Sequence, residues 1–500
     1  MDKRGHRVLF WVLPLICLFT GCVRAPGPML PAQDSLPAAR FFEDLDAAVE
    51  QAGVRDAGAV PVAGFPYLRA DRFLAAMAPG LLDGRRKDAW TRALEAADRA
   101  ARRREIANLP PAVLSDPALG ISRWGLASPE ELLDAAAGHA RALSAHDRST
   151  PDFVESVAEA VRIPDEYRTA MRIMGLYPVA VVPVSIVTEQ VQQRFAGWHR
   201  EPWDRIETRG RLSWFSPVPS APATMDDIRR IHGPDRRDAL GVPRLDAAEA
   251  DALVRRFAPV IVQDDAGEYD RWGRVAWGRD GPRVDGRAPV LYHYISHAFF
   301  KSAPILQINY TLWYPARKGP GAPRIEHGIL DGLTIRVSLD TAGSPFMVDV
   351  MNNCGCYHFF VPQQRRVLEI LPQPGALSPF VPRWLPERFP EERLLLRVNS
   401  GWHQVVHLGT VSAAAGPTGF YGLLPYEALE SLPRPDGTSE NLFDPEGIAK
   451  GSERIEPYLF FSMGIPRVGS MRQRGHHAIR LVGRAHFDDP SLFDKTFRFK

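Results

Sequence analysis

The sequence has almost no excess charge of either sign, and it lacks the common catalytic motifs. Its 61 lysine and arginine residues face 59 aspartate and glutamate residues, which gives a formal net charge of +2 at pH 7. A nucleic-acid-binding protein would carry a strongly basic surface instead. The chain also has no GxSxG elbow, no GxxxxGK(S/T) phosphate loop and no HExxH helix. These absences exclude the commonest hydrolase, nucleotide-binding and zinc-protease classes.

Cysteine is scarce, with four residues in 500, and two of the four lie in the N-terminal segment. That segment has a positive start, an apolar run from Val8 to Phe19 and small residues before Cys22. The run is too short for a transmembrane helix, which needs about 20 apolar residues, and Pro14 interrupts it. Such a composition is typical of a secretory signal peptide.

Residues 18–22 (LFTGC) resemble the lipobox of bacterial lipoproteins, in which the signal is cut before the cysteine and that cysteine carries the lipid. The resemblance implies a signal peptide over residues 1–21 and a palmitate-bearing lipid anchor on Cys22. Phe19 stands where that family most often has Leu. An Asp straight after the cysteine tends to hold these proteins at the inner membrane, so Val23 favours the outer membrane, facing the periplasm. The alternative is an ordinary signal peptide that happens to contain Cys22.

A mature chain of about 480 residues is long enough for more than one domain, at roughly 100 to 200 residues each. We predict an α+β fold, with an N-terminal helical domain followed by a β-rich, sandwich-like antiparallel domain. The predicted segments are a Pro-rich tether over 22–40, the helical domain over 41–200, a connecting segment over 201–248 and the β-rich domain over 249–500.

Helical signals dominate the first part of the chain. Within residues 85–107, apolar residues recur at three- and four-residue spacing, at Trp90, Leu94, Ala97 and Ala101. Residues 128–131 (SPEE) form a capping box with proline at the first helical position, which predicts a helix start there. The apolar stretch 171–187 is broken by glycine and proline, and we expect it to be buried in the helical core.

Beyond about residue 201 the hydrophobic period shifts towards two, which indicates strands. Apolar residues alternate with polar ones over 306–314, over 333–339 and again over 346–350, with a turn before the last segment. These three segments predict consecutive antiparallel strands. Further strands are predicted at residues 289–299, 365–371, 394–408 and 476–483.

The densest group of reactive side chains is residues 352–358 (NNCGCYH). Cys354, Cys356 and His358 offer ligands suited to zinc, and a thiolate is also a nucleophile. In an ideal strand, neighbours on one face lie about 6.6 Å apart, too far for two sulfurs each ~2.3 Å from one metal. A shared metal would need a bend, which Gly355 allows. A metal site, a disulfide or redox pair, packing cysteines and a nucleophilic cysteine all remain open.

Other candidate ligands lie elsewhere in the sequence. His403 and His407 would share a strand face ~13 Å apart, which favours structural roles. His477 belongs to a segment that either completes a site from another strand or carries hydrogen-bonded surface residues. The acidic stretch 264–270 has oxygen ligands suited to calcium but lacks the EF-hand pattern, so a solvated turn is favoured.

An aromatic strand over 311–315, a Gly/Pro loop and then residues 326–331 (EHGILD) resemble, in that order, the secreted necrosis-inducing, Nep-like proteins. The resemblance implies a β-sandwich with a divalent cation. It carries over only His327 and Asp331, as cation-site residues. Residues 332–333 (GL) stand where the family signature has Trp and Glu, and the spacing from His to Asp is longer.

Residues 331–333 and 354–358 resemble uncharacterised lipoproteins of Gram-negative bacteria, a group that implies no activity. The first functional hypothesis is a lipid-anchored envelope protein, a binding or structural module with a Cys/His metal or disulfide site, whose expected partner is the membrane through the lipid on Cys22. The alternative is a metal-dependent hydrolase acting on envelope material, with zinc or another divalent metal. Its ligands would be His327, Asp331, Cys354, Cys356 and His358.

Overall fold

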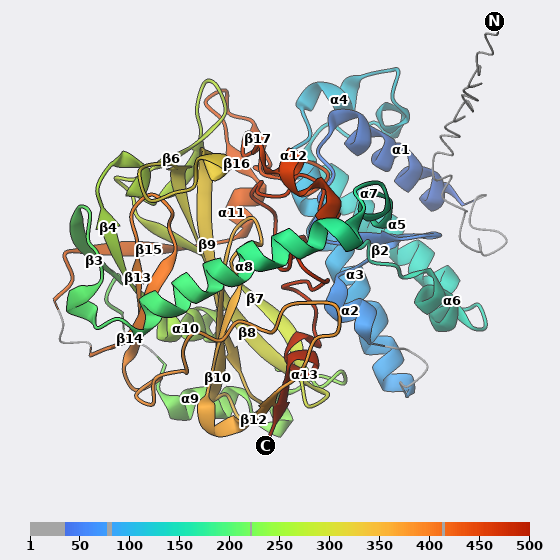
Figure 1. Ribbon diagram of the computed structural model, residues 1–500. Helices are drawn as coiled ribbons and strands as arrows, with labels where there is room; N and C mark the ends of the chain where they lie inside the picture. The colour runs from blue at the N-terminus through green and yellow to red at the C-terminus, as the bar shows by residue number, and fades with distance from the viewer. Residues whose placement is uncertain (1–35, 78–82, 221–222, 413–415) are drawn as a thin grey trace, which may run out of the picture.

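The computed structural model of the chain describes residues 36–77, 83–220, 223–412 and 416–500. Helices prevail up to residue 200 and strands prevail after it, which confirms the α+β class (Figure 1). The predicted signal peptide and lipidation site lie outside the described residues. Every contact reported below joins described residues, so a chain that begins at Val23 keeps all of them.

The helical region packs around a buried cluster that includes Phe41, Leu94 and Leu132. The Ser128 hydroxyl accepts a hydrogen bond from the Glu131 N–H at 3.2 Å, so the helix predicted to start there is confirmed. The first helix begins at Pro37, inside the predicted tether. The elements are α1 (Pro37–Ala52), β1 (Val60–Val62), β2 (Phe65–Ala70), α2 (Arg72–Ala76), α3 (Gly84–Ala107), α4 (Pro111–Ser115), α5 (Pro129–Asp147), α6 (Phe153–Ala160), α7 (Thr169–Met174) and α8 (Tyr177–Arg200).

The larger part of the molecule is built on one ten-stranded sheet, in the order β11-β10-β9-β8-β7-β15-β3-β4-β13-β14. The sheet is mixed rather than wholly antiparallel, because β15 pairs in parallel with β3 and β7, and β13 with β4. The predicted connecting segment supplies β3, which lies inside the sheet. The strands of the ten-stranded sheet are β3 (Arg211–Pro217), β4 (Val260–Asp265), β7 (Val290–Phe300), β8 (Ala303–Arg317), β9 (Gly328–Leu339), β10 (Pro345–Asn352), β11 (Phe359–Pro362), β13 (Arg393–Val398), β14 (Val405–Val411) and β15 (Gly419–Pro425).

Strands β7 to β10 follow one another as antiparallel neighbours, as the alternation predicts. Both of their faces are covered. On one face lie α9 (Met225–Ile231) and α10 (Ala247–Phe257), and on the other lies α13 (Leu492–Thr496) with other C-terminal segments. The polar residues of β8 are therefore buried and bond across strands, as Thr311 does with Thr334 at 3.1 Å.

Two strand predictions differ from the structure. Residues 394–408 form two strands joined by a turn, and 476–483 form no strand but an isolated bridge between Ala478 and His486. The remaining elements are β5 (Arg274–Trp277), β6 (Pro282–Asp285), β12 (Val367–Ile370), α11 (Glu427–Glu430), β16 (Leu432–Pro433), β17 (Ser439–Glu440), α12 (Glu456–Phe460) and β18 (Phe497–Phe499).

The expectation that residues 171–187 are buried is wrong. They form α7 and the first half of α8, which runs across the surface of the β-rich part (Figure 1), and most of their large apolar side chains are exposed. Helix α8 is anchored instead by Phe195 and His199 near its C-terminal end. Among the described residues, no helix has the length and apolarity needed to cross a membrane.

The helical region is joined to the β-rich part by buried charge. The Glu430 carboxylate, fully buried on α11, accepts hydrogen bonds from Arg474 at 2.7 Å and from Gln473 at 2.9 Å. Arg104 of α3 lies 3.4 Å from the same carboxylate and also bonds Asp56. Because a buried carboxylate needs compensating partners, these contacts fix α3 against the rest of the molecule.

Candidate functional site

The five predicted metal ligands do not form one group. His327 is exposed, with its Nε2 atom 3.2 Å from the Ala322 carbonyl oxygen. Asp331, in β9, is completely buried. Over the described residues, no three or more His, Cys, Asp or Glu side chains are arranged to hold a metal ion. Metal binding by these residues stays a prediction. A metal would have to compete with the hydrogen bonds and ion pairs that these side chains already make.

Asp331 belongs to a buried chain of charged groups that crosses the sheet. Arg317, at the end of β8, binds both carboxylate oxygens of Asp331, at 2.8 and 2.9 Å. Its remaining amino group donates to Glu326 at 2.6 Å, and the Trp402 indole donates to the same Glu326 oxygen at 2.9 Å. Paired, bidentate contacts of this kind are what make burial of such charges tolerable.

His403, in the turn before β14, extends this buried network of charged side chains. Its Nδ1 atom lies 2.7 Å from an Asp331 oxygen, and its Nε2 atom lies 3.1 Å from Asp270. The imidazole stacks on the Tyr314 ring, with the ring centroids 3.7 Å apart and the planes 4° from parallel. His403 has a φ of +54°, a left-handed conformation that a non-glycine residue keeps only when its surroundings fix it.

The charges in this network stabilise one another. Burial opposes ionisation of Asp331, but Arg317 and His403 outweigh it and hold the pKa of that carboxyl well below its usual range. Burial likewise opposes a charged His403, but its hydrogen bonds with Asp270 and Asp331 raise the pKa of the imidazole. The two carboxylates therefore favour the protonated form of His403, in which neither ring nitrogen has a lone pair for a metal.

His358 lies in a second, separate network. Its Nε2 atom is 2.8 Å from Asp349, whose two oxygens also accept from Arg336 at 2.9 and 2.6 Å. The Arg336 guanidinium lies 3.6 Å from the centroid of the Phe487 ring, a cation–π contact. This arrangement fixes the C-terminal segment against β9 and β10.

The other histidines are dispersed. His407 lies 3.4 Å from the Arg383 guanidinium, and His477 Nε2 lies 3.1 Å from the Asn353 carbonyl oxygen. Burial lowers the pKa of His477 to about 3 and that of His407 to about 4, so both are neutral at pH 7. Each of the two contributes a local contact.

Cys354 and Cys356 are free thiols in the turn between β10 and β11. A hydrogen bond to Cys354, together with burial, raises the pKa of Cys356 well above its usual value. Gly355 between them has a φ of +88°, and a Cβ atom there would lie 2.3 Å from the Ala478 carbonyl oxygen. Only glycine fits this turn, so the bend that Gly355 was expected to allow is present and brings the two thiols together.

We expect these thiols to react at least a hundredfold more slowly with Ellman's reagent in the folded chain Val23–Lys500 than in urea. A hydrogen bond with Cys356 lowers the pKa of Cys354, but this thiol is buried and closed to the reagent, whereas the half-buried Cys356 has a raised pKa and is a poor nucleophile. Two thiols per chain should be counted after unfolding, and EDTA should leave the native rate unchanged. Acceleration by EDTA would reveal a thiolate-bound metal instead. A count of zero thiols in urea would reveal a disulfide.

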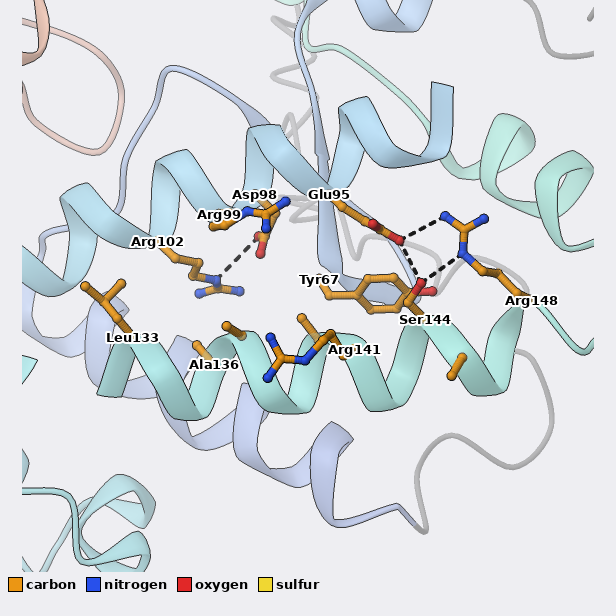
Figure 2. A pocket seen from close by; sticks show the side chains of 13 residues that line it. Tyr67, Glu95, Asp98, Arg99, Arg102, Leu133, Ala136, Arg141, Ser144 and Arg148 are labelled. Atoms are coloured by element: carbon orange, nitrogen blue, oxygen red, sulfur yellow. Dashed lines mark hydrogen bonds and ion pairs between the residues drawn. The ribbon is translucent and has the colours of Figure 1, made fainter. Parts of the chain in front are cut away.

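An open cavity lies between α3 and α5 in the helical region (Figure 2). Its volume is about 320 Å³, close to the lower end of the range usual for small-molecule sites. Small side chains on one face of α5 leave the space between the two helices unfilled, with Ala136, Ala140 and Ser144 at four-residue spacing. The buried ring of Tyr67, from β2, lines the cavity, and its hydroxyl bonds Asp147 at 2.7 Å.

Positively charged side chains outnumber negatively charged ones around this cavity. Four arginines and two carboxylates line it, an excess of two positive charges; these residues are Arg99, Arg102, Arg141, Arg148, Glu95 and Asp98. The two carboxylates are satisfied: Glu95 accepts from Ser144 at 2.7 Å and from Arg148 at 3.1 Å. Among the described residues, no hydrogen bond or ion pair engages Arg99 or Arg141, and both are exposed at the cavity.

Sequence reasoning did not predict this cavity. The available signal was a run of small residues at helical spacing on 136–145, facing a helix rich in arginine. Small residues on a helix more often permit close packing of two helices, and the sequence pattern alone does not distinguish close packing from a cavity.

Comparisons of this chain with protein-family models, with curated proteins and with solved structures find no match. Its function is therefore argued from its own residues.

Proposed function

We propose that this chain is a lipid-anchored binding protein of the bacterial cell envelope, and that its ligand is a small molecule with an anionic group and an apolar part. The observation that carries the proposal is the cavity between α3 and α5, lined by alanines and Tyr67. There the guanidinium groups of Arg99 and Arg141 have no carboxylate partner among the residues that the structure describes. Arginine suits carboxylate, sulfate and phosphate groups because its planar fork donates two parallel hydrogen bonds.

The same reasoning gives less support to a metal-dependent hydrolase. Both ring nitrogens of His403 lie against carboxylates, those of Asp331 and Asp270, and Asp331 also binds Arg317. The Nε2 atom of His358 lies against the buried carboxylate of Asp349. A catalytic metal needs an open coordination position. The cavity between the helices supplies an opening but no metal ligand set, which favours binding over catalysis.

Phenyl phosphate is a suitable probe, because it combines one anionic group with one small apolar ring. In isothermal titration of the chain Val23–Lys500, we expect it to bind, and we expect the double variant Arg99→Gln/Arg141→Gln to bind at least tenfold more weakly. Inorganic phosphate and phenol should each bind more weakly than the whole probe, since each keeps only half of the interactions.

Arg103→Gln is the matched control, because Arg103 is an exposed arginine on α3 that does not line the cavity. This variant should bind phenyl phosphate as the unaltered chain does. Equal weakening by the control variant, or no binding to the unaltered chain, would contradict the assignment of the cavity.

The anchor is tested separately in cells. The full-length chain should incorporate labelled palmitate and fractionate with the outer membrane, and Cys22→Ser should abolish the labelling. Absence of label on the unaltered chain would contradict the lipobox assignment, and it would leave the ligand cavity untouched.

A further inference from the structure

The surface of this protein has one large apolar area. Of the sixteen exposed large hydrophobic side chains among the described residues, eleven lie on two neighbouring segments, seven within 173–187 and four within 455–461. The segments adjoin, because both α7 and α8 contact the short 3₁₀ helix Phe461–Met463 that continues α12. We call these eleven side chains the apolar face. Concentrated exposed apolar surface of this kind marks an interaction site.

The solvent-exposed side of α8 has the apolar residue pattern expected of a helix side that packs against a core. Val179, Val182 and Ile186 recur at three- and four-residue spacing and are 70%, 56% and 52% exposed. A surface helix of a soluble domain turns such a stripe towards the core and presents charged residues to water. Residues 173–188 contain no charged residue at all.

The two hydroxyl side chains in the first half of α8 bond to their own helix. The Thr188 hydroxyl donates to the Val184 carbonyl at 2.7 Å, and the Ser185 hydroxyl donates to the Val182 carbonyl at 2.8 Å. Hydroxyls that bond back to their own helix are satisfied without solvent. The first half of α8 is thus suited to an environment that offers no hydrogen bonds.

We propose that the apolar face lies against the lipid surface of the membrane and holds the body of the protein flat on it, an inference that rests on the lipid anchor proposed above. The chain runs fourteen residue steps from Cys22 to Leu36, a span of at most about 50 Å at ~3.6 Å per residue. The tether therefore keeps the folded part beside the bilayer, where a weakly binding apolar surface is sufficient.

The charges beside the apolar face agree with a lipid surface. Arg168 precedes the uncharged stretch, and Glu189 and Arg194 follow it; all three are exposed, so the exposed flanking residues carry a net positive charge. Interfacial helices combine a buried apolar side with basic residues that meet anionic headgroups. Tyr458 on α12, 87% exposed, is an amphipathic ring of the kind found at membrane interfaces.

Vesicle flotation tests this placement. The chain Val23–Lys500, which lacks the lipidated cysteine, should float with vesicles of phosphatidylethanolamine and phosphatidylglycerol at 3:1, and less with uncharged phosphatidylcholine vesicles. Val179→Asp/Val182→Asp should reduce the bound fraction at least tenfold. Both side chains are exposed, so this variant should keep the circular dichroism spectrum and melting temperature of the unaltered chain.

Leu368→Asp/Phe420→Asp is the matched control, since these side chains are similarly exposed but belong to β12 and β15. It should float normally. The proposal is overturned if the unaltered chain stays in solution, if the control loses binding equally, or if ultracentrifugation shows a dimer that only Val179→Asp/Val182→Asp dissociates. Flotation without palmitate labelling would refute the anchor alone, and labelling without flotation would refute only this inference.

Discussion

Replacing Arg317 with methionine is expected to lower the free energy of unfolding by about 3–5 kcal/mol, because removing one partner of a buried ion pair leaves the other charge uncompensated. Arg317 is the shared cation of two buried carboxylates, Asp331 and Glu326. Its loss would also remove a countercharge from the Asp331–His403 contact. Urea unfolding followed by circular dichroism measures the difference.

Arg287→Met is the control for this effect. Arg287 also forms an arginine–aspartate pair, with Asp285 at 3.0 Å, but the pair is exposed to water. Its removal should leave the urea midpoint unchanged. If Arg317→Met unfolds at the same urea concentration as the unaltered chain, the buried network does not hold the sheet as described.

Acid is expected to destabilise the fold steeply between pH 6.5 and 4, because several histidines are buried in the neutral form. Burial lowers the pKa of His199 and His477 to about 3 and that of His297 to about 4. An unfolded histidine titrates near 6.5, so below that pH the unfolded chain binds more protons than the folded chain and stability falls. At pH 5 each of the three should cost about 2 kcal/mol, together about 6.

The titration of His403 changes the stability with pH in the opposite direction. Its pKa is raised on folding, so its contribution to stability is fully present below pH ~6.5 and is lost as the pH rises through the folded-state pKa. The pKa of His476 is also raised, by its contact with Glu166, but burial lowers the pKa of His407 and His486 to about 4, so the neutral buried histidines still outnumber the charged ones. The net expectation is therefore a loss of stability in acid, comparable with the whole stability of an ordinary domain, about 5–15 kcal/mol.

The variant His297→Phe isolates one part of the acid effect. His297 packs against the Phe73 ring with centroids 5.3 Å apart, and phenylalanine keeps that contact without a titrating group. Urea melts at pH 7.5 and pH 5.0 should show a stability difference about 2 kcal/mol smaller for the variant than for the unaltered chain. An unchanged pH dependence would contradict the burial of a neutral His297.

Local sequence patterns predicted the elements that local chemistry controls. The cap at Ser128 and the alternation in β8, β9 and β10 were sufficient, because a helix start and a strand face are set by residues a few positions apart. The parallel pairs that β13 and β15 make were not predictable in this way. They join segments more than a hundred residues apart, and no periodicity records the partner.

The candidate site shows the same limit. Asp331 and His403 were both named as candidate ligands, but only the fold places them 2.7 Å apart and adds Asp270 and Arg317 as their partners. For residues 171–187, apolar composition predicted burial because burial is its usual consequence. Their exposure in the structure is the observation that points to the membrane surface.

Hydrogen exchange of the chain Val23–Lys500 with and without phenyl phosphate tests most directly where this protein binds its ligand. The account predicts slower exchange in α3 and α5, around residues 95–102 and 136–148, and no change in the Arg99→Gln/Arg141→Gln variant. Protection confined to residues 317–331, 354–358 and 403 would contradict it, because the ligand would then occupy the buried Cys/His region of the sheet rather than the cavity between the helices.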